Sequence, residues 1–292
     1  MTNEEFATYA IEHLTEYLSP GATADVALVG LAPDGQEQGF LLGRQGTSAS
    51  QIVPLHVCNE AMTAGATPGE ALRQMTALSR RETNSILGLS IHLEEFDAVR
   101  TNLTMAVCDP VEQADFLQDK PWRRLGSLAV YYQLRFDTRN ERTVMITVSN
   151  SLMEAWGQSE TTLHILAAFN GRLSDPAWLE LPGVDGDTPP NLLDAPPAGP
   201  QRELLRLTNR SHFLGAGVIG WPGVPEGVAR IVGGDYLVIP FSVHSLLVLP
   251  LDGDLDVAAW ETGLHLLRSC ADQVPSTHLY MYEHRSSSLA AI

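Results

Sequence analysis

The clearest pattern of hydrophobic and polar positions lies between Ser127 and Asn170. The segments SLAVYYQLRF and TVMITVS alternate in the manner of two strands of a hairpin, and NSLMEAWGQSETTLHILAAFN follows with helical spacing. Ser159, which is followed by Glu160, is expected to cap this helix. The stretch therefore predicts a hairpin that leads into a helical segment, and it contains no recognisable reactive group.

The part of the chain before this stretch predicts helices around a small hairpin. Apolar residues from Phe6 to Leu18 recur every three or four positions, which indicates one amphipathic helix. The segments ADVALVGLA and GFLLGRQ flank the turn-forming PDGQEQ and predict a hairpin. Thr67, Pro68 and Glu70 form a capping box with proline at the first helical position, so TPGEALRQMTALSRRE should be a helix.

The later part of the chain predicts more strands. These are LLRLTN, LGAGVIGW, YLVIPF, HSLLVLP and HLYMYEH, with helices expected at PEGVARIV and VAAWETGLHLLRSCAD. Six prolines lie between Pro182 and Pro200, so residues 182–202 should be an irregular loop or linker. Strands at hairpin spacing interrupted by helices predict an α+β fold, with mostly antiparallel sheet and flanking helices.

The expected organisation has two portions. Residues 1–119 form a helical portion that carries the small hairpin, and residues 120–292 form the α+β sheet portion. The hydrophobic pattern is equally compatible with one interlocked domain.

Composition adds a strong acidic imbalance. Aspartate and glutamate number 35 against 18 basic residues, for a net charge of −17. Direct binding to a nucleic-acid backbone needs clustered lysine and arginine, so this balance argues against it. A basic protein partner is compatible with the charge, and so is a surface whose acids only keep the protein in solution.

The three cysteines, Cys58, Cys108 and Cys270, are widely separated and odd in number. They supply neither a disulfide framework nor a paired metal knuckle, which is typical of a reducing cytoplasm. The first residues are acidic and amphipathic rather than signal-like, and no apolar run approaches the ~18 residues of a membrane span. We therefore expect a soluble cytoplasmic protein.

Several of these segments, taken in order, carry a family resemblance. SLAVYYQLRF, TVMITVSNSLMEAWGQSETTLHILAAFN, the run from LLRLTN to HSLLVLP, and HLYMYEH together resemble the bacterial domain-of-unknown-function family 5688. PLHVCNEAMTAGATPGEALRQM and FLQDKPWRRLGSLAVYY extend the likeness over most of residues 50 to 284. The resemblance implies a shared fold, and it supplies no catalytic residues because the family has no assigned activity.

Two motifs suggest ligands but lack the required context. GAGVIG at Gly215–Gly220 satisfies a dinucleotide pattern, yet the residues Trp221 to Pro225 that follow it do not favour a helix beginning at the glycines. We therefore expect a glycine-rich strand against which something packs closely. Asp252, Asp254 and Asp256 alternate as in a calcium loop, but the later glycine and glutamate are missing. They remain weak metal candidates beside the simpler interpretation of an acidic turn. No motif calls for a cofactor.

The polar residues at strand ends give the weak catalytic candidates. Ser242 and His244 lie in the turn FSVHS between two apolar strands, where serine hydroxyls usually bond to backbone. Asn150 and Asn209 each end a strand, and they would form a site with His244 if these ends met in space.

Our leading interpretation is a non-enzymatic protein that binds a protein partner through its acidic surface. The first alternative is a hydrolase that uses the region of Asn150, Asn209 and His244. The second is an acidic inhibitor that imitates nucleic acid, which would need carboxylates in two rows at phosphate-like spacing.

Overall fold

The computed structural model describes most of the chain from Asn3 to Ile292. The described residues are 3–17, 22–23, 28–30, 38–44, 51–54, 58, 61–78, 93, 95–137, 143–182, 189–251 and 274–292. The chain divides into two compact units. Unit 1 comprises residues 1–102, 134–147 and 155–157, and unit 2 comprises 103–133, 148–154 and 158–292.

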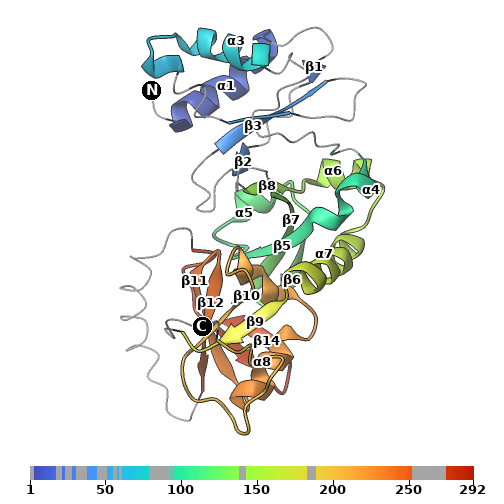
Figure 1. Cartoon of the computed structure of the whole chain (residues 1–292), viewed down its shortest axis with the longest axis vertical. Helices are drawn as coiled ribbons and strands as arrows, with labels where there is room; N and C mark the ends of the chain where they lie inside the picture. Colours follow the sequence, from blue (N-terminus) through green and yellow to red (C-terminus); the bar gives the residue numbers. More distant parts are fainter. Residues whose placement is uncertain are drawn as a thin grey trace. The chain divides into compact units, whose positions relative to one another are not determined.

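Unit 1 contains a helix pair with its own core. Helices α1 (Asn3–Tyr17) and α3 (Pro68–Leu78) lie side by side (Figure 1). Burial of apolar side chains between them stabilises the pair, since removing such surface from water is favourable. The buried residues of this core are Phe6, Ala10, Leu14, Cys58, Ala71 and Leu72.

The capping box at the start of α3 is confirmed. The Glu70 backbone N–H donates to Thr67 Oγ1 at 3.3 Å, and the Thr67 backbone N–H donates to Glu70 Oε2 at 2.8 Å. These two bonds satisfy backbone groups that the first turn of a helix leaves without partners. The Thr67 backbone N–H and the Thr67 hydroxyl both donate to Glu70 Oε2, and these two bonds hold the pKa of Glu70 below its usual value.

Antiparallel strands complete unit 1. Their order is β1-β3-β2-β8-β7, with β4 on β3. The pairing of β2 with β3 confirms the predicted hairpin, whose tip lies outside the described residues. The bounds are β1 (Ala22–Thr23), β2 (Leu28–Gly30), β3 (Gln38–Arg44), β4 (Gln51–Pro54) and β8 (Thr143–Thr147), with the short helices α4 (Phe96–Val99) and η1 (Arg100–Asn102).

Strand β7 (Leu128–Asp137) belongs to both units. Its residues up to Gln133 are part of unit 2, and those from Leu134 onward are part of unit 1. In unit 2 it pairs with β6 (Trp122–Leu125) through a tight turn at Gly126.

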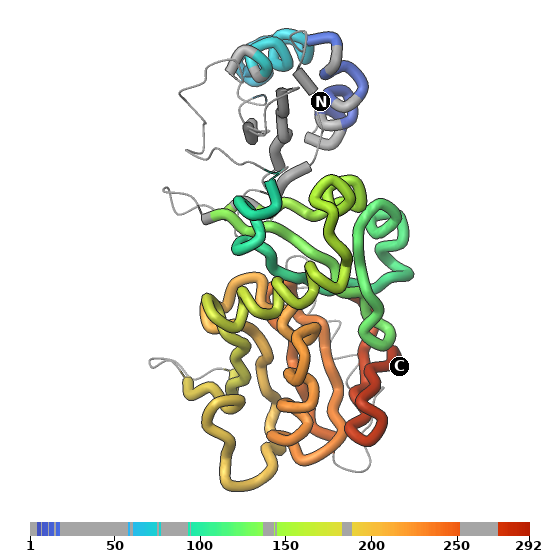
Figure 2. Tube along the Cα trace, turned by 90° about the vertical axis from the view of Figure 1, so that its right-hand side faces the viewer, coloured from blue at the N-terminus to red at the C-terminus, as the bar shows by residue number. Residues whose placement is uncertain are grey.

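Unit 2 is built around a six-stranded antiparallel sheet, whose strands run side by side in Figure 2. The order is β14-β13-β11-β12-β10-β9, and every residue of β12 is buried. The predicted strands LLRLTN, YLVIPF, HSLLVLP and HLYMYEH are thereby confirmed. The bounds are β9 (Ala177–Glu180), β10 (Leu205–Asn209), β11 (Tyr236–Ser242), β12 (Ser245–Pro250), β13 (Tyr280–Glu283) and β14 (Ser288–Ala291).

Helices and a further strand complete unit 2. Helix α7 (Glu160–Ser174) packs on β5 (Leu103–Cys108), and the Asn170 side-chain amide donates to the Leu103 carbonyl at 3.1 Å. The predicted N-cap is confirmed, because the Thr162 backbone N–H donates to Ser159 Oγ at 3.2 Å. The other helices are α5 (Ala114–Leu117), α6 (Asn150–Ala155) and α8 (Val224–Val232), the last at the predicted PEGVARIV.

The structure confirms the α+β class and corrects one element. The strand expected at LGAGVIGW is wrong, since Gly215–Gly220 forms a fully buried 3₁₀ helix, η2. The expectation that something packs closely against these glycines is correct. A Cβ added at Gly217 would lie 2.0 Å from the Met105 carbonyl oxygen of β5.

The proline-rich loop and the last predicted helix have different outcomes. Between β9 and β10, the described residues 181–182 and 189–204 contain neither helix nor strand. Asn191 holds this loop to β9 by accepting from the Leu179 backbone N–H at 2.9 Å and donating to the Ala177 carbonyl at 3.0 Å. The helix predicted at VAAWETGLHLLRSCAD lies outside the described residues. Among the helices that are described, none has the length and apolar character needed to cross a bilayer.

Candidate functional site

Two of the predicted strand-end residues hold the same loop. Asn209 ends β10, and its side chain donates to the Phe213 carbonyl at 2.7 Å and accepts from the Phe213 backbone N–H at 3.0 Å. His244, in the turn between β11 and β12, accepts from the Leu214 backbone N–H at Nδ1, 3.0 Å away. The structure therefore brings Asn209 and His244 to one loop, residues 210–214, whereas the hypothesis also required Asn150.

These contacts are those of a structural clamp. Because Nδ1 of His244 accepts an amide proton, the ring proton of the neutral tautomer lies on Nε2. Ser242 Oγ accepts from the His244 backbone N–H at 3.1 Å, so its hydroxyl bonds to backbone as expected for a turn. The clamp holds His212 (φ 57°) and Leu214 (φ 54°) in the left-handed region, which costs on the order of 1 kcal/mol for each residue.

The third member of the predicted site lies elsewhere in the fold. Asn150 is the first residue of α6, and its backbone N–H donates to the Asp119 carbonyl at 2.7 Å. The cap of α6 comes from Ser149, whose Oγ accepts from the Leu152 backbone N–H at 3.1 Å. The weak metal candidates Asp252, Asp254 and Asp256 lie outside the described residues.

A different surface stands out on α7. One side of this helix is in the core, where Leu163, Ala167 and Ala168 are buried. On the other side three large apolar side chains are exposed at intervals of four residues, and we call this set the α7 face. Its members are Ile165 (60% exposed), Phe169 (56%) and Leu173 (72%).

A polar network anchors the first turn of α7. Arg123 Nε and a terminal nitrogen donate to the two carboxylate oxygens of Glu160, each at 2.8 Å, which is the bidentate geometry that Arg favours. Tyr132 OH also donates to Glu160. Burial would raise the pKa of Glu160, but these hydrogen bonds outweigh it and hold that pKa below its usual range. The carboxylate is therefore ionised and keeps the helix in place.

His164 lies next to this network on the buried side of α7. Its Nδ1 is 3.3 Å from Tyr132 OH, and the residue is 7% exposed. Burial lowers the pKa of His164 below its ordinary value of 6.5, and the positive charge of Arg123 adds to the lowering. The opposing effect of Glu160 is smaller.

This depressed pKa predicts a loss of stability in mild acid. The unfolded chain binds a proton at His164 near pH 6.5, whereas the folded protein binds this proton only at lower pH. The stability that neutral His164 contributes is therefore complete above pH 6.5 and is lost as the pH falls below it. We expect the free energy of unfolding to decrease less between pH 7 and pH 5 in His164→Gln than in the wild type. Urea unfolding at these two pH values measures the difference.

The matched control for this experiment is His284→Gln, which changes an exposed histidine. Its pH dependence should equal that of the wild type. An equally steep acid loss in His164→Gln would show that His164 is not responsible.

Sequence reasoning missed the α7 face, although a signal for it exists. The stretch from Leu163 to Phe169 is apolar at nearly every position, which is wider than the single stripe of an ordinary surface helix. A helix that is apolar on both sides must cover two surfaces or leave one of them open.

Comparison with known proteins agrees with the resemblance found in the sequence. No curated protein and no solved structure matches the chain. One family model does match, and it covers residues 3–263, which include α7, the loop of residues 210–214 and most of the six-stranded sheet. The chain therefore belongs to the family of unknown function DUF5688.

Proposed function

We propose that this protein is non-enzymatic and acts by binding a protein partner that covers the α7 face. The observation that carries the proposal is the alignment of Ile165, Phe169 and Leu173 on one helix side. At about 1.5 Å per residue, the three side chains form a row about 12 Å long. Such a row matches the spacing of apolar positions on a partner helix.

Burial of the α7 face by a partner would be energetically favourable. Single exposed apolar residues are ordinary on protein surfaces, but contiguous ones mark interaction sites. Covering a large apolar side chain contributes about 1.5–3 kcal/mol when burial is complete. The opposite side of α7 is already packed in the core through Leu163 and Ala167, so this helix does not have to fold when a partner binds.

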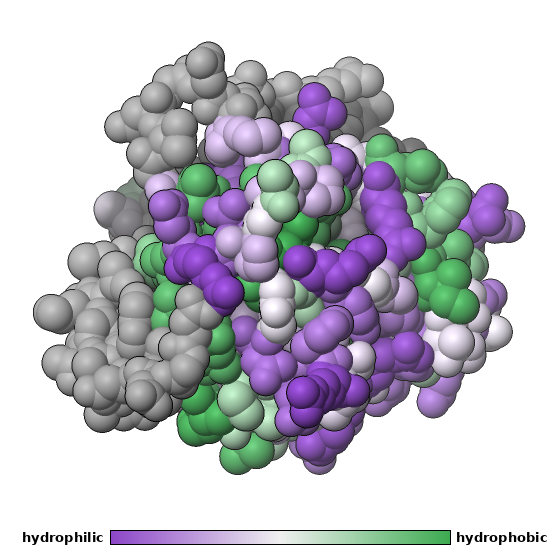
Figure 3. Space-filling model, turned by 90° about the horizontal axis from the view of Figure 1, so that it is seen from below, coloured by the Kyte–Doolittle hydropathy of each residue, from purple (hydrophilic) through white to green (hydrophobic). Residues whose placement is uncertain are grey.

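Charge defines the chemistry of the partner. Unit 2 contains 20 acidic and 10 basic residues, a formal net charge of −10 with histidine neutral. On the face drawn in Figure 3, hydrophilic side chains predominate and hydrophobic ones gather in smaller groups. A negative field speeds encounter with positively charged proteins. We therefore infer an amphipathic, net basic helical segment as the partner, in the cytoplasm of a bacterium.

The cysteines are compatible with a reducing compartment. Cys58 and Cys108 are buried free thiols, and burial raises the pKa of each to about 12. Thiols of this kind are unreactive, because the thiolate is the nucleophilic form. They support a structural role for both residues.

The test is capture of a partner from host lysate with the wild type, Phe169→Ser and Leu173→Ser. We expect the wild type to retain a net basic protein that both variants lose, and the purified partner should bind each variant at least tenfold more weakly in calorimetry. The variants should remain folded and lose at most about 2 kcal/mol of stability, because the replaced side chains are more than half exposed.

Ile292→Ser is the matched control, since it removes an exposed apolar side chain away from α7. It should capture the same partner as the wild type. Equal binding by Phe169→Ser would contradict the proposal. Sedimentation of the purified protein adds a second check, because self-association that is lost in Phe169→Ser would make the occupant a second copy of this chain. The hydrolase that would use Asn150, Asn209 and His244, and the inhibitor that imitates nucleic acid, stay predictions.

A further inference from the structure

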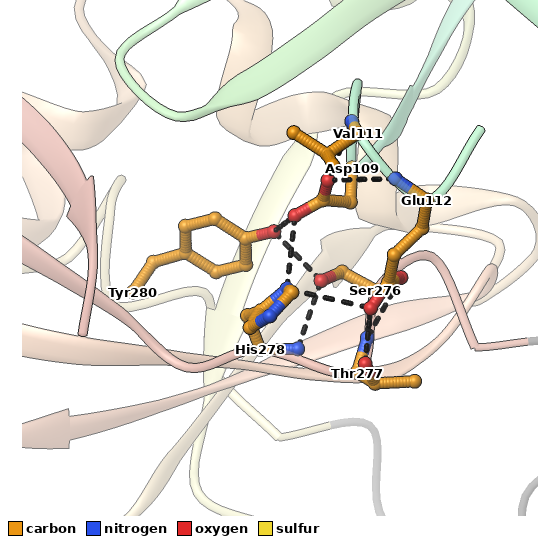
Figure 4. A network of polar contacts seen from close by, with 7 residues as sticks. All are labelled: Asp109, Val111, Glu112, Ser276, Thr277, His278 and Tyr280. Carbon is orange, nitrogen blue, oxygen red and sulfur yellow. Dashed lines mark hydrogen bonds and ion pairs between the residues drawn. The ribbon is translucent and has the colours of Figure 1, made fainter. Parts of the chain in front are cut away.

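A compact group of metal-ligating side chains lies in unit 2, away from the α7 face. Asp109 and Glu112 are in the turn that follows β5, and His278 is in the segment that leads into β13 (Figure 4). One oxygen of each carboxylate and one ring nitrogen of the histidine all lie within 4.8 Å of one another. The backbone joins the two segments, because the Asp109 N–H donates to the Pro275 carbonyl at 3.1 Å.

Asp109 is held by its own turn. Its Oδ1 accepts from the backbone N–H groups of Val111 at 2.7 Å and Glu112 at 3.1 Å. Its Oδ2 accepts from Tyr280 OH at 2.7 Å and points toward His278. Burial would raise the pKa of Asp109, but the bonds from Tyr280 and the backbone outweigh it and lower that pKa. The carboxylate is therefore charged at neutral pH.

Two further side chains face Asp109. Glu112 lies in the same turn, and His278 lies in the segment that leads into β13. The Glu112 carboxylate accepts the Thr277 backbone N–H, at 3.2 Å and 3.1 Å to its two oxygens. His278 Nδ1 lies 3.1 Å from Asp109 Oδ2 and 3.3 Å from Glu112 Oε1. The imidazole nitrogen thus sits between two carboxylate oxygens.

We propose that Asp109, Glu112 and His278 bind a divalent first-row transition metal ion through one carboxylate oxygen each and Nδ1 of the histidine. Ligands about 2.1 Å from a metal lie about 3.0 Å apart in octahedral geometry and about 3.4 Å apart in tetrahedral geometry. The two measured nitrogen to oxygen distances, 3.1 Å and 3.3 Å, fall in this interval.

The surrounding residues have the form of an outer coordination shell. Tyr280 OH donates to Asp109 Oδ2, and it is 2.7 Å from Ser276 Oγ, which can donate to it in turn. Because a hydroxyl carries one proton, Tyr280 can donate to Asp109 while it accepts from Ser276. Ser276 is itself fixed, since its Oγ also accepts from the His278 backbone N–H at 3.0 Å. Groups that orient ligands in this way typically change metal affinity about 10–100-fold.

The donor set selects the class of ion. Calcium and magnesium prefer oxygen ligands throughout, whereas a neutral imidazole suits zinc, iron, cobalt and nickel. The His278 side chain is 49% exposed and that of Glu112 is 25% exposed, whereas Asp109 is 5% exposed. Three protein ligands on one side, with solvent on the other, leave further coordination positions to water or to a ligand.

The competing interpretation is that Nδ1 of His278 carries a proton and donates it to the carboxylates, as a hydrogen bond or an ion pair, and that no metal binds. The two interpretations differ in a measurable way. Metal binding uses the lone pair of Nδ1, so this nitrogen must carry no proton, whereas the hydrogen bond and the ion pair both need a proton there. Only the metal site produces a bound ion with nitrogen and oxygen ligands.

The experiment is titration of the purified full chain with Co²⁺ and with Zn²⁺ at physiological salt and excess Mg²⁺. The magnesium occupies weak acidic sites of this protein of net charge −17. We expect one Co²⁺ per chain with visible d–d absorption, and displacement of Co²⁺ by Zn²⁺. His278→Ala and Glu112→Gln should lower the affinity at least tenfold, and Tyr280→Phe about tenfold.

His13→Ala is the matched control. His13 Nδ1 lies 3.1 Å from Glu16 Oε1, so this pair reproduces one contact of the site without a third ligand. The control should bind Co²⁺ as the wild type does. Circular dichroism checks that each variant folds. Asp109→Asn is a further variant of a ligand, and if it does not fold because Asp109 is buried, the variants of Glu112 and His278 still test the metal site. Absence of stoichiometric Co²⁺ in the wild type, or unchanged absorption in His278→Ala, would overturn the proposal in favour of the ion pair.

Discussion

Replacement of Gly217 by alanine should destabilise the protein by about 3 kcal/mol, because the added methyl group has no space. The nearest atom is the Met105 carbonyl oxygen at 2.0 Å, and the next are the Met105 carbonyl carbon at 2.8 Å and Ala106 Cα at 3.2 Å. All three are backbone atoms of β5, which cannot rotate away as the end of a side chain can. Either η2 or β5 must therefore move.

Urea unfolding followed by tryptophan fluorescence measures this effect. Gly199→Ala is the control, since a Cβ there meets no atom within 4 Å. It should leave the free energy of unfolding within about 0.5 kcal/mol of the wild type. If the two variants unfold alike, the close approach of η2 to β5 is incorrect.

Arg206→Met should cost about 3 kcal/mol of stability, because it leaves the carboxylate of Glu180 buried without its principal partner. Glu180 in β9 is fully buried and pairs across the sheet with Arg206 of β10. Arg206 Nε donates to Glu180 Oε1 at 2.5 Å, and His212 Nδ1 lies 3.6 Å from the same oxygen. The other oxygen, Oε2, has no hydrogen-bond partner within the described part of the chain.

A double substitution separates the charge from the packing. Glu180→Leu with Arg206→Met removes both charges and keeps most of the side-chain volume, so we expect it to be more stable than Arg206→Met alone. Arg100→Met is the control for an exposed pair, since Arg100 and Asp97 are 53% and 92% exposed. It should change stability by less than about 0.5 kcal/mol. A double variant as unstable as the single one would mean that packing of Arg206, rather than its charge, is what matters.

The features that could be predicted from the sequence are those set by neighbouring residues. The capping box at Thr67 and the N-cap at Ser159 depend on groups three residues away, so their residue types suffice to find them. The strand pattern of β10 to β13 was also readable, because buried strands have long apolar runs. The α+β class follows from those elements.

The features that could not be predicted depend on distant residues. Gly215–Gly220 lies in an apolar run that predicts a strand, but it forms a 3₁₀ helix packed against β5, a contact that no local pattern shows. His278 and Asp109 are 169 positions apart, and no local pattern links them. The helical pattern that starts at Asn150 did predict the start of α6, but no local pattern shows whether Asn150 and His244 meet in space.

The segments of the two units alternate along the chain, which limits how one unit could be exchanged between genes. The chain passes from one unit to the other after residues 102, 133, 147, 154 and 157, and the second of these passages divides a single strand, β7, after Gln133. Neither unit is one contiguous sequence, so no single recombination event can transfer one of them to another gene. A hybrid of two members of the family should accordingly fold only when all the segments of one unit come from the same parent.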